Sequence, residues 1–228
     1  MPRWGAAVKE INLESFEEFH QQVQSYNKET DIYRGVTSKD YQLVPKIGRV
    51  PLRPRQSRQR EEGRIFRRFK ERALPYLEFI PRNDWDWLAV AQHHGLPTRL
   101  LDWTRNPLAA LYFAVEHESI HDSAIYVLRE YKVLSTKTHL DPFKYPQVGK
   151  FVPDRITPRI SAQIGVFTIH PEPEKPFLSD SLEKLIIPNR IREQLKRIAD
   201  TYGINRATLF PDLDGLAHHI TWQGTGVY

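Results

Sequence analysis

The feature that most constrains this chain is the stretch 87–115, where a polar loop lies between two apolar helical patterns. Asn83, or the aspartate after it, is placed to cap the first helix, and Gly95 lies where a helix favours a left-handed residue at its end. Asn106, followed by proline, supplies the N-cap and first turn of the second helix. That helix is apolar on every face, which predicts burial. Rigid buried elements are therefore expected to hold the loop 98–105.

The loop 98–105 concentrates polar chemistry, with two guanidinium groups, one carboxylate, two hydroxyls and one indole. Loops on a rigid scaffold are where binding and catalytic residues commonly lie. Asp102 would act as a general base or as a negative charge beside a developing cation, or else organise the turn. Trp103 would stack on a ligand or pack in the core. Thr98 and Thr104 would bind a ligand or cap the backbone.

A strand is predicted at 31–36, with Arg34 and Gly35 near its end. Arg34 would clamp a phosphate while Gly35 lets the ligand approach the backbone, or Arg34 would form a buried ion pair with Asp102. In both cases the two charged residues are expected to be neighbours. We expect them to line one concave pocket with His93 or the histidine after it.

Helical and strand patterns alternate along the rest of the chain, which predicts a mixed α/β fold in a single domain over 1–228, with its core at about 16–219. A mixed sheet flanked by helices is expected, and its strand order stays open. Strands are expected at 31–36, 123–130, 164–169 and 185–187, and further helices at 15–23, 57–77, 189–203 and 216–222. Residues 1–10 are expected as a loose arm, and prolines predict irregular backbone at 37–56 and 131–158.

Positive charge is concentrated in the segment 49–72, within a basic helical insertion at 49–77. It holds ten cationic side chains and three carboxylates, a net charge of +7, while the whole chain carries +5. This segment would attract phosphates or an acidic partner, or would simply be a solvated helix face. Phe66 and Phe69 are expected to pack inward, so binding would be electrostatic, without base stacking. Nucleic-acid contacts would come from Arg58, Arg60, Arg64, Arg67 and Arg68.

The chain has no cysteine, which excludes disulfides, thiolate nucleophiles and cysteine-ligated zinc. Its longest apolar run is too short to span a bilayer and its N-terminus lacks an apolar signal core, so we expect a soluble cytoplasmic protein without a membrane partner. Residues 117–121 match H-E-x-x-H, which on a helix places two imidazoles around zinc. Because the match lies at the expected end of a helix, no metal is expected, and a zinc peptidase is the weakest alternative.

Four motifs resemble the FRG domain family, which is named for its Phe/Tyr-Arg-Gly signature. They follow the family's order along the chain, and the second is long and specific. The motifs are Tyr33–Gly35, His93–Thr104, Pro158–Ile160 with Gln163–Phe167, and Leu209–Leu216. The resemblance covers about residues 16–219 and implies a fold more directly than a function.

A more distant resemblance to ADP-ribosyltransferases implies a mechanism. In those enzymes a first strand carries Arg or His beside a small residue, a Ser or Thr precedes an Ala-x-x-Phe helix and a strand, and a third strand carries the catalytic Glu. Arg34 and Gly35 are similar to the first element, and Thr104 with the helix of Phe113 to the second. At the third element this chain has Gln163 in place of Glu. The resemblance implies a split sheet and NAD as a substrate.

Two functions stay open. One is an NAD-dependent ADP-ribosyltransferase-like enzyme that modifies a macromolecule as a toxin or a phage-defence effector. The other is a non-catalytic module that binds nucleic acid or a partner protein through the segment 49–72. For the enzyme, catalytic roles are expected of Asp102, Gln163 and His93, and NAD contacts of Arg34, Gly35, Thr98, Arg99, Trp103 and Thr104.

Overall fold

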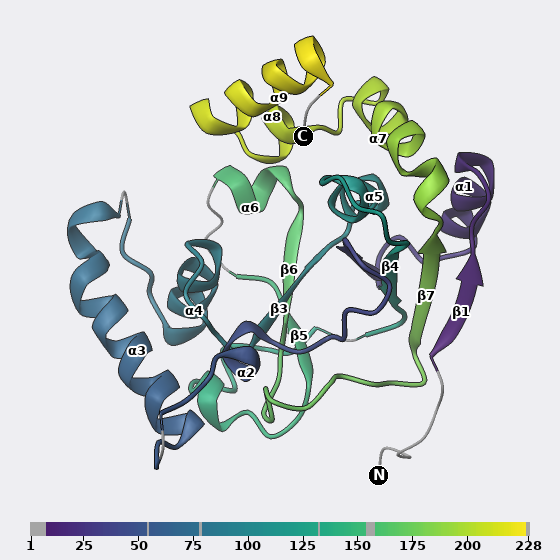
Figure 1. Ribbon diagram of the computed structural model, residues 1–228. Coiled ribbons are helices and arrows are strands. Elements are labelled where there is room, and N and C mark those ends of the chain that lie inside the picture. The colour runs from purple at the N-terminus through teal and green to yellow at the C-terminus, as the bar shows by residue number, and fades with distance from the viewer. Residues whose placement is uncertain (1–7, 54, 78, 132, 154–157, 227–228) are drawn as a thin grey trace.

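The computed structural model describes residues 8–53, 55–77, 79–131, 133–153 and 158–226. Within these residues seven strands form one mixed sheet in the order β1-β7-β4-β2-β3-β6-β5 (Figure 1). The strands are β1 (Lys9–Asn12), β2 (Ile32–Val36), β3 (Leu100–Thr104), β4 (Ser123–Leu128), β5 (Gly149–Phe151), β6 (Gly165–Ile169) and β7 (Leu182–Ile187). β1 is parallel to β7, and the other neighbours in this sheet are antiparallel. The predicted mixed α/β fold is confirmed.

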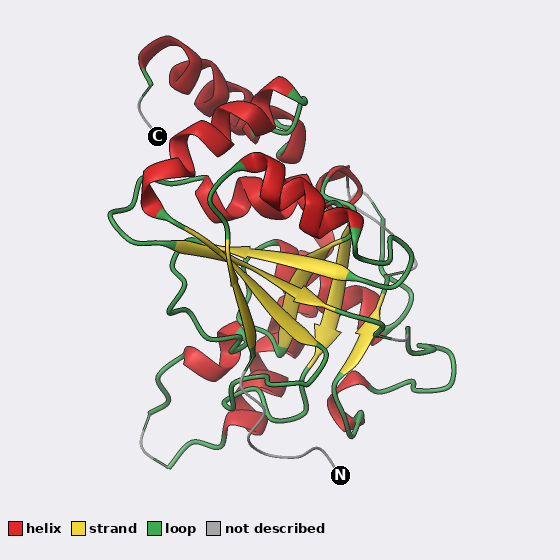
Figure 2. Ribbon diagram, turned by 90° about the vertical axis from the view of Figure 1, so that its right-hand side faces the viewer, coloured by secondary structure: helices red, strands yellow, loops and turns green. Residues whose placement is uncertain are grey.

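Helices pack around the sheet, and Figure 2 shows the strands fanning out between helices above and below them. The helices are α1 (Phe16–Gln24), α2 (Lys46–Arg49), α3 (Arg58–Ala73), α4 (Asp84–His93), α5 (Pro107–Val115), α6 (Pro158–Ala162), α7 (Arg192–Thr201), α8 (Arg206–Leu209) and α9 (Leu213–Thr225). Among the residues that the structure describes, no helix combines the length and apolar character needed to cross a membrane.

One face of the sheet is covered by two separate groups of helices. Over β2, β4 and β7, Ile125 and Leu185 pack in a cluster with α1, α5 and α7. Over β3, β5 and β6, Leu100 and Phe167 pack in a second cluster with α3 and α4. A further cluster, which includes Trp103, lies on the opposite face of the sheet. The boundary between the two helical groups therefore lies over β2 and β3.

The ends of α4 and α5 are set by the residues that the sequence indicated. The Asn83 side chain accepts a hydrogen bond from the backbone N–H of Asp86, and the Asn106 side chain accepts from the first N–H groups of α5. Gly95 has a φ of +82°, in the left-handed region. Both predicted buried helices are confirmed.

The segment between α4 and α5 was expected to be a loop, and that prediction is wrong because it contains the inner strand β3. Leu101 and Trp103 are buried on one face of this strand, while Asp102 between them is exposed. β3 pairs with β6 along all five of its residues. Five residues are too few for an alternating pattern to distinguish a strand from a loop, and the partner strand lies far along the chain.

Several short elements also differ from expectation. β1 begins inside the predicted loose arm, α2 and β5 lie in stretches predicted to be irregular, and α6 lies where no helix was predicted. α9 covers residues 213–225, more than the predicted 216–222. Pairing with β7 holds β1 and pairing with β6 holds β5. Elements this short depend on distant partners, so their own periodicity does not reveal them.

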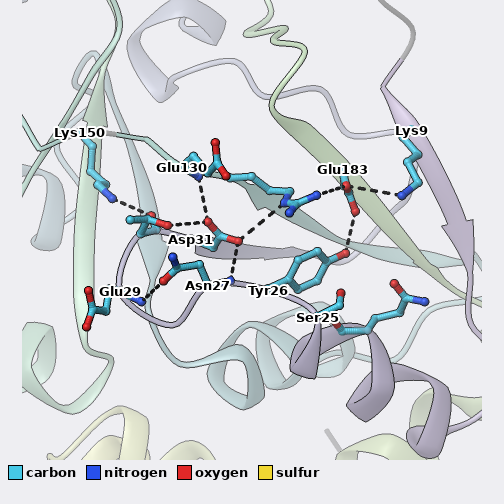
Figure 3. A network of polar contacts seen from close by, with 12 residues as sticks. Lys9, Ser25, Tyr26, Asn27, Glu29, Asp31, Glu130, Lys150 and Glu183 are labelled. Atoms are coloured by element: carbon cyan, nitrogen blue, oxygen red, sulfur yellow. Dashed lines mark hydrogen bonds and ion pairs between the residues drawn. The ribbon is translucent and has the colours of Figure 1, made fainter.

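A buried polar network fixes the beginning of β2 (Figure 3). The Asp31 carboxylate accepts hydrogen bonds from the backbone N–H groups of Asn27 at 3.0 Å and Glu130 at 2.8 Å. Lys150 of β5 is buried, which lowers its pKa, and its Nζ donates to the Thr30 carbonyl at 2.7 Å. Because β5 is the edge strand beyond β3 and β6, the sheet must curl to bring it to the start of β2.

Candidate functional site

Strands β2 and β3 meet at one paired position and then separate. Among the described residues Tyr33 pairs with Thr104, whereas β2 pairs with β4 over its whole length. The C-terminal half of β2 and the N-terminal half of β3 therefore diverge, and we call the space between them the wedge. The sheet is continuous, so the split sheet implied by the resemblance to ADP-ribosyltransferases is not confirmed.

A cavity of about 530 Å³ lies at this wedge, within the size range of small-molecule binding sites. Its walls come from β2, α2, the end of α4, β3, α5 and the segment before β6. The polar side chains that matter most for its chemistry are Arg34, Lys46, Gln92, His93, Asp102 and Gln163. The wedge thus gathers residues that lie far apart in the sequence.

Arg34 and Asp102 are neighbours in this cavity, as the sequence predicted. The Arg34 Nη1 donates to the Asp102 backbone carbonyl at 2.6 Å and lies 3.5 Å from the carboxylate Oδ2. Their side chains are 23% and 52% exposed, so the pair is solvated and its ionic interaction contributes at most about 1 kcal/mol. The buried ion pair considered from the sequence is therefore not formed, and both groups can reach a ligand.

A hydrogen bond from Gln92 of α4 orients the Asp102 carboxylate. Gln92 Nε2 donates to its Oδ2 at 2.8 Å, and the Thr98 hydroxyl donates to Gln92 Oε1 at 2.6 Å. Thr98 is buried, and its hydroxyl also accepts from the backbone N–H of Leu100 at 3.1 Å. Thr98 therefore lies behind the cavity wall and orients Gln92, a role different from the predicted NAD contact.

Gly35 lines the cavity, and its missing side chain is required by α5. A Cβ at this position would overlap the carbonyl oxygen of Ala110 and lie 2.6 Å from the backbone N of Ala114. The expectation from sequence was that glycine lets a ligand approach the backbone. The structure gives a second reason, which is the close contact of a helix with β2.

His93 at the end of α4 and Gln163 before β6 also line the cavity. Gln163 is fixed at two points. Its side-chain Nε2 donates to the Leu209 carbonyl at 3.1 Å, and its backbone carbonyl accepts from the Thr104 hydroxyl at 2.6 Å. The three residues predicted to be catalytic, with Asp102 as the third, therefore share one cavity.

Trp103 and Thr104 contribute mainly to the wall, since each residue is 3% exposed. The indole Nε1 of Trp103 donates to the Thr168 hydroxyl at 2.8 Å, and that hydroxyl bonds to His170 Nε2 at 2.9 Å. Burial, together with the nearby Arg34 guanidinium, lowers the pKa of His170 to about 3, so its imidazole is neutral at physiological pH. The predicted ligand contacts of Trp103 and Thr104 are limited to a small exposed surface.

Arg99 belongs to the core. Its Nη2 and Nε lie 2.7 and 3.0 Å from the Glu62 carboxylate oxygens, and the two side chains are 4% and 2% exposed. Its guanidinium carbon also lies 4.9 Å above the centre of the Phe143 ring. The guanidinium N–H groups of Arg99 donate to the buried Glu62 carboxylate, away from the cavity. The predicted NAD contact therefore does not fit this geometry.

Several lining residues were missed from the sequence, and one was noticed only for its charge. Tyr41, Lys46 and Gln92 carried no motif signal, while Arg49 was counted in the basic segment 49–72. Lys46 and Arg49 reach the cavity because the short helix α2 lies beside it. A four-residue helix in a proline-rich stretch gives no periodic signal by which this could be predicted.

The arginines of α3 divide into two groups. Arg58 donates to the backbone carbonyls of Ile47 and Val50, so it fastens α2 to α3 and differs from its predicted nucleic-acid role. The other four arginines of the prediction are exposed along the helix. These exposed arginines are Arg60, Arg64, Arg67 and Arg68.

The H-E-x-x-H pattern lacks the helix that a zinc site would need. α5 ends at Val115, and residues 117–121 form bends before β4. His117 and His121 are therefore not presented from adjacent turns of one helix. No group of three or more His, Cys, Asp or Glu side chains within the described ranges is arranged to hold a metal ion.

Comparison with known proteins identifies a family for part of this chain. Residues 29–123 match the model of the FRG domain, from just before β2 to the first residue of β4. Searches of curated proteins and of solved structures gave no match. The matched part contains Arg34, His93 and Asp102, while Gln163 lies beyond it.

Proposed function

We propose that this chain, which matches the FRG domain over residues 29–123, is an NAD-dependent ADP-ribosyltransferase-like enzyme. It would modify a macromolecule as a toxin or a phage-defence effector. The observation that carries the proposal is one cavity lined by Arg34, His93, Asp102 and Gln163. A few convergent polar groups in a concave site are the usual composition of an active site.

In ADP-ribosyl transfer, Asp102 and Arg34 would have different roles. The bond between ribose C1′ and the nicotinamide nitrogen breaks, its electron pair stays on nicotinamide, and C1′ bonds to a nucleophile of the target, which loses a proton. Positive charge develops on the ribose during this step, so a nearby carboxylate stabilises the transition state. Asp102, which Gln92 holds, supplies this charge. Arg34 supplies a guanidinium suited to phosphate oxygens.

Gln163 and His93 complete the proposed site. Gln163 stands where the ADP-ribosyltransferase pattern has Glu, and its amide can bond a ribose hydroxyl but carries no negative charge. Asp102 therefore takes the carboxylate role in this proposal. His93, which lines the same cavity, is assigned to accept the proton of the attacking group.

Arg34→Ala is expected to abolish NAD binding while costing only about 1–2 kcal/mol of stability, because it removes one solvated pair and one hydrogen bond. Asp102→Asn is expected to retain NAD binding and to slow transfer roughly 100-fold, since the amide cannot stabilise the developing cation. Melting temperature with and without NAD measures binding, and transfer of label from NAD to lysate components measures activity.

Arg197→Ala, which changes an exposed arginine on α7 outside both proposed sites, is the matched control and should leave both readouts unchanged. The enzymatic proposal fails if the unmodified protein shows neither NAD consumption nor label transfer, whether or not NAD shifts its melting temperature. A stability loss of several kcal/mol in Arg34→Ala would instead mark this arginine as structural.

A second function, binding of nucleic acid, is favoured by the exposed face of α3. This helix lies at the edge of the molecule (Figure 1). At 3.6 residues per turn, its four exposed arginines fall within roughly 100° of one another, away from the buried Phe66. Cations spread along an outer helix face suit a phosphate backbone and read no base sequence.

Replacing Arg60, Arg64, Arg67 and Arg68 together with alanine is expected to weaken duplex DNA binding and to reduce the slope of log K against log salt by about 3 to 4, because each phosphate contact contributes about 0.9. Fluorescence anisotropy over a salt series measures this slope. Arg197→Ala, an exposed arginine on α7, is the control. Binding that does not change with salt, or that the fourfold variant retains, would refute this function.

A further inference from the structure

Cationic side chains outnumber carboxylates in the lining of the cavity. Arg34, Lys46 and Arg49 line it, against the one carboxylate of Asp102 in this lining, which gives a net charge of +2 with histidine neutral. An excess of one sign of charge in a cleft attracts a ligand of the opposite sign. A diphosphate diester, with its two anionic phosphates, matches this excess.

The helix α2 that carries two of these cations is fixed to the rest of the fold. The Ile47 backbone N–H donates to the carbonyl of Thr98, two residues before β3, at 3.1 Å. Gly48 is packed so closely that a Cβ would overlap the carbonyl oxygen of Pro173. Arg58 ties the end of α2 to α3 through the Val50 carbonyl at 3.1 Å. A backbone held at three points gives its side chains defined positions at the cavity.

Lys46 and Arg49 both keep donors for a ligand. The Lys46 Nζ donates to the Gly95 carbonyl at 2.6 Å, and Gly95 itself lines the cavity. An ammonium has three N–H donors, so two are left over. Arg49 is exposed at the cavity, and its guanidinium makes no hydrogen bond or ion pair with the described residues.

An aromatic side chain lies in the same cavity. Tyr41 lines it and is 58% exposed, so its ring is accessible to a ligand. Its ring offers a stacking surface for a nucleobase. This favours a nucleotide over a simple phosphate as the ligand.

We propose that Lys46 and Arg49 of α2, together with Arg34 of β2, bind the diphosphate of a nucleotide whose base lies beside Tyr41. The identification of that nucleotide with NAD rests on the proposed function. The diphosphate site itself rests on the charge of the cavity and the anchoring of α2.

The experiment measures binding of ADP-ribose and of adenosine to the full chain by calorimetry. The unmodified protein is expected to bind ADP-ribose, and Lys46→Ala and Arg49→Ala should each weaken it roughly 10-fold through loss of a charge-assisted hydrogen bond. Adenosine, which has no phosphate, should bind all variants equally. Arg53→Ala is the matched control, because Arg53 is exposed close to α2 but outside the cavity lining.

Three results would overturn the site: no binding of ADP-ribose to the unmodified protein, unchanged ADP-ribose binding in Arg49→Ala, or an equal loss in Arg53→Ala. Arg49 is exposed and forms no hydrogen bond or ion pair with the part of the chain that the structure describes. Its variant is therefore decisive even if Lys46→Ala lowers the melting temperature. Binding that follows the expected pattern without any ADP-ribosyl transfer would support this site and refute the enzyme. If the unmodified protein transfers ADP-ribose and Lys46→Ala and Arg49→Ala transfer it equally well, the enzyme is supported and this diphosphate site is refuted.

Discussion

Replacing Arg99 with methionine is expected to lower the free energy of unfolding by about 3–5 kcal/mol, because the Glu62 carboxylate is left buried without its partner. The two side chains are 4% and 2% exposed, and the guanidinium approaches the carboxylate through two nitrogens. The same guanidinium lies over the Phe143 ring, so one residue connects α3, the start of β3 and the turn at 142–144. Methionine fills much of the same space, which separates loss of charge from loss of volume. Urea unfolding of both proteins measures the difference.

Two further variants test the reason for this loss. Adding Glu62→Leu to Arg99→Met is expected to recover much of the stability, because the uncompensated charge is then gone. Arg64→Ala breaks the partly exposed pair with Glu61 on the same helix and should cost less than about 1 kcal/mol. If Arg99→Met costs no more than Arg64→Ala, the buried pair does not hold α3 to the sheet.

Gly35→Ala is expected to cost about 3 kcal/mol or more and to remove ligand binding at the same time. A Cβ would overlap the Ala110 carbonyl oxygen and crowd the Ala114 nitrogen, which are backbone atoms of α5. No change of rotamer relieves such an overlap, so α5 must move away from β2, and overpacking of this kind usually costs about 1–3 kcal/mol, occasionally more. Phe113 of α5 lines the cavity, so its wall would move as well. Urea unfolding and the NAD-dependent melting shift measure the two effects.

Gly63→Ala is the matched control for this substitution. A Cβ on Gly63, within α3, would meet nothing within 4 Å. Alanine there should stabilise the protein by about 0.5–1 kcal/mol, because glycine loses more conformational freedom in a helix. A Gly35→Ala protein as stable as the unmodified one would show that α5 does not depend on this close contact.

The cavity extends beyond the part of the chain that matches the FRG domain. Residues 29–123 supply Arg34, the end of α4, β3 and α5. Gln163 comes from outside the match, and it is joined to α8 through the Leu209 carbonyl. A fragment ending at residue 123 would therefore lack one wall of the proposed site, as well as strand β6, which pairs with β3.

The sequence by itself determined what depends on local interactions. Asn83, Gly95 and Asn106 act within a few residues of their own positions, so the ends of α4 and α5 could be predicted. The apolar strands β2, β4 and β6 could be recognised from their composition. The proximity of Arg34 to Asp102 followed from placing each charged residue at the end of a buried element, where it needs a partner or a ligand.

Only the tertiary structure decided which distant groups meet. Arg99 and Asp102 are three positions apart in one motif, yet Arg99 is neutralised by Glu62, 37 residues away, while Asp102 faces the cavity. The wedge exists because β2 and β3 pair at one position and then diverge. Lys46 joins the site because α2 is fastened beside it. Periodicity reports which face of an element is buried, but the partner on that face is chosen by strand order and helix packing, which no local pattern encodes.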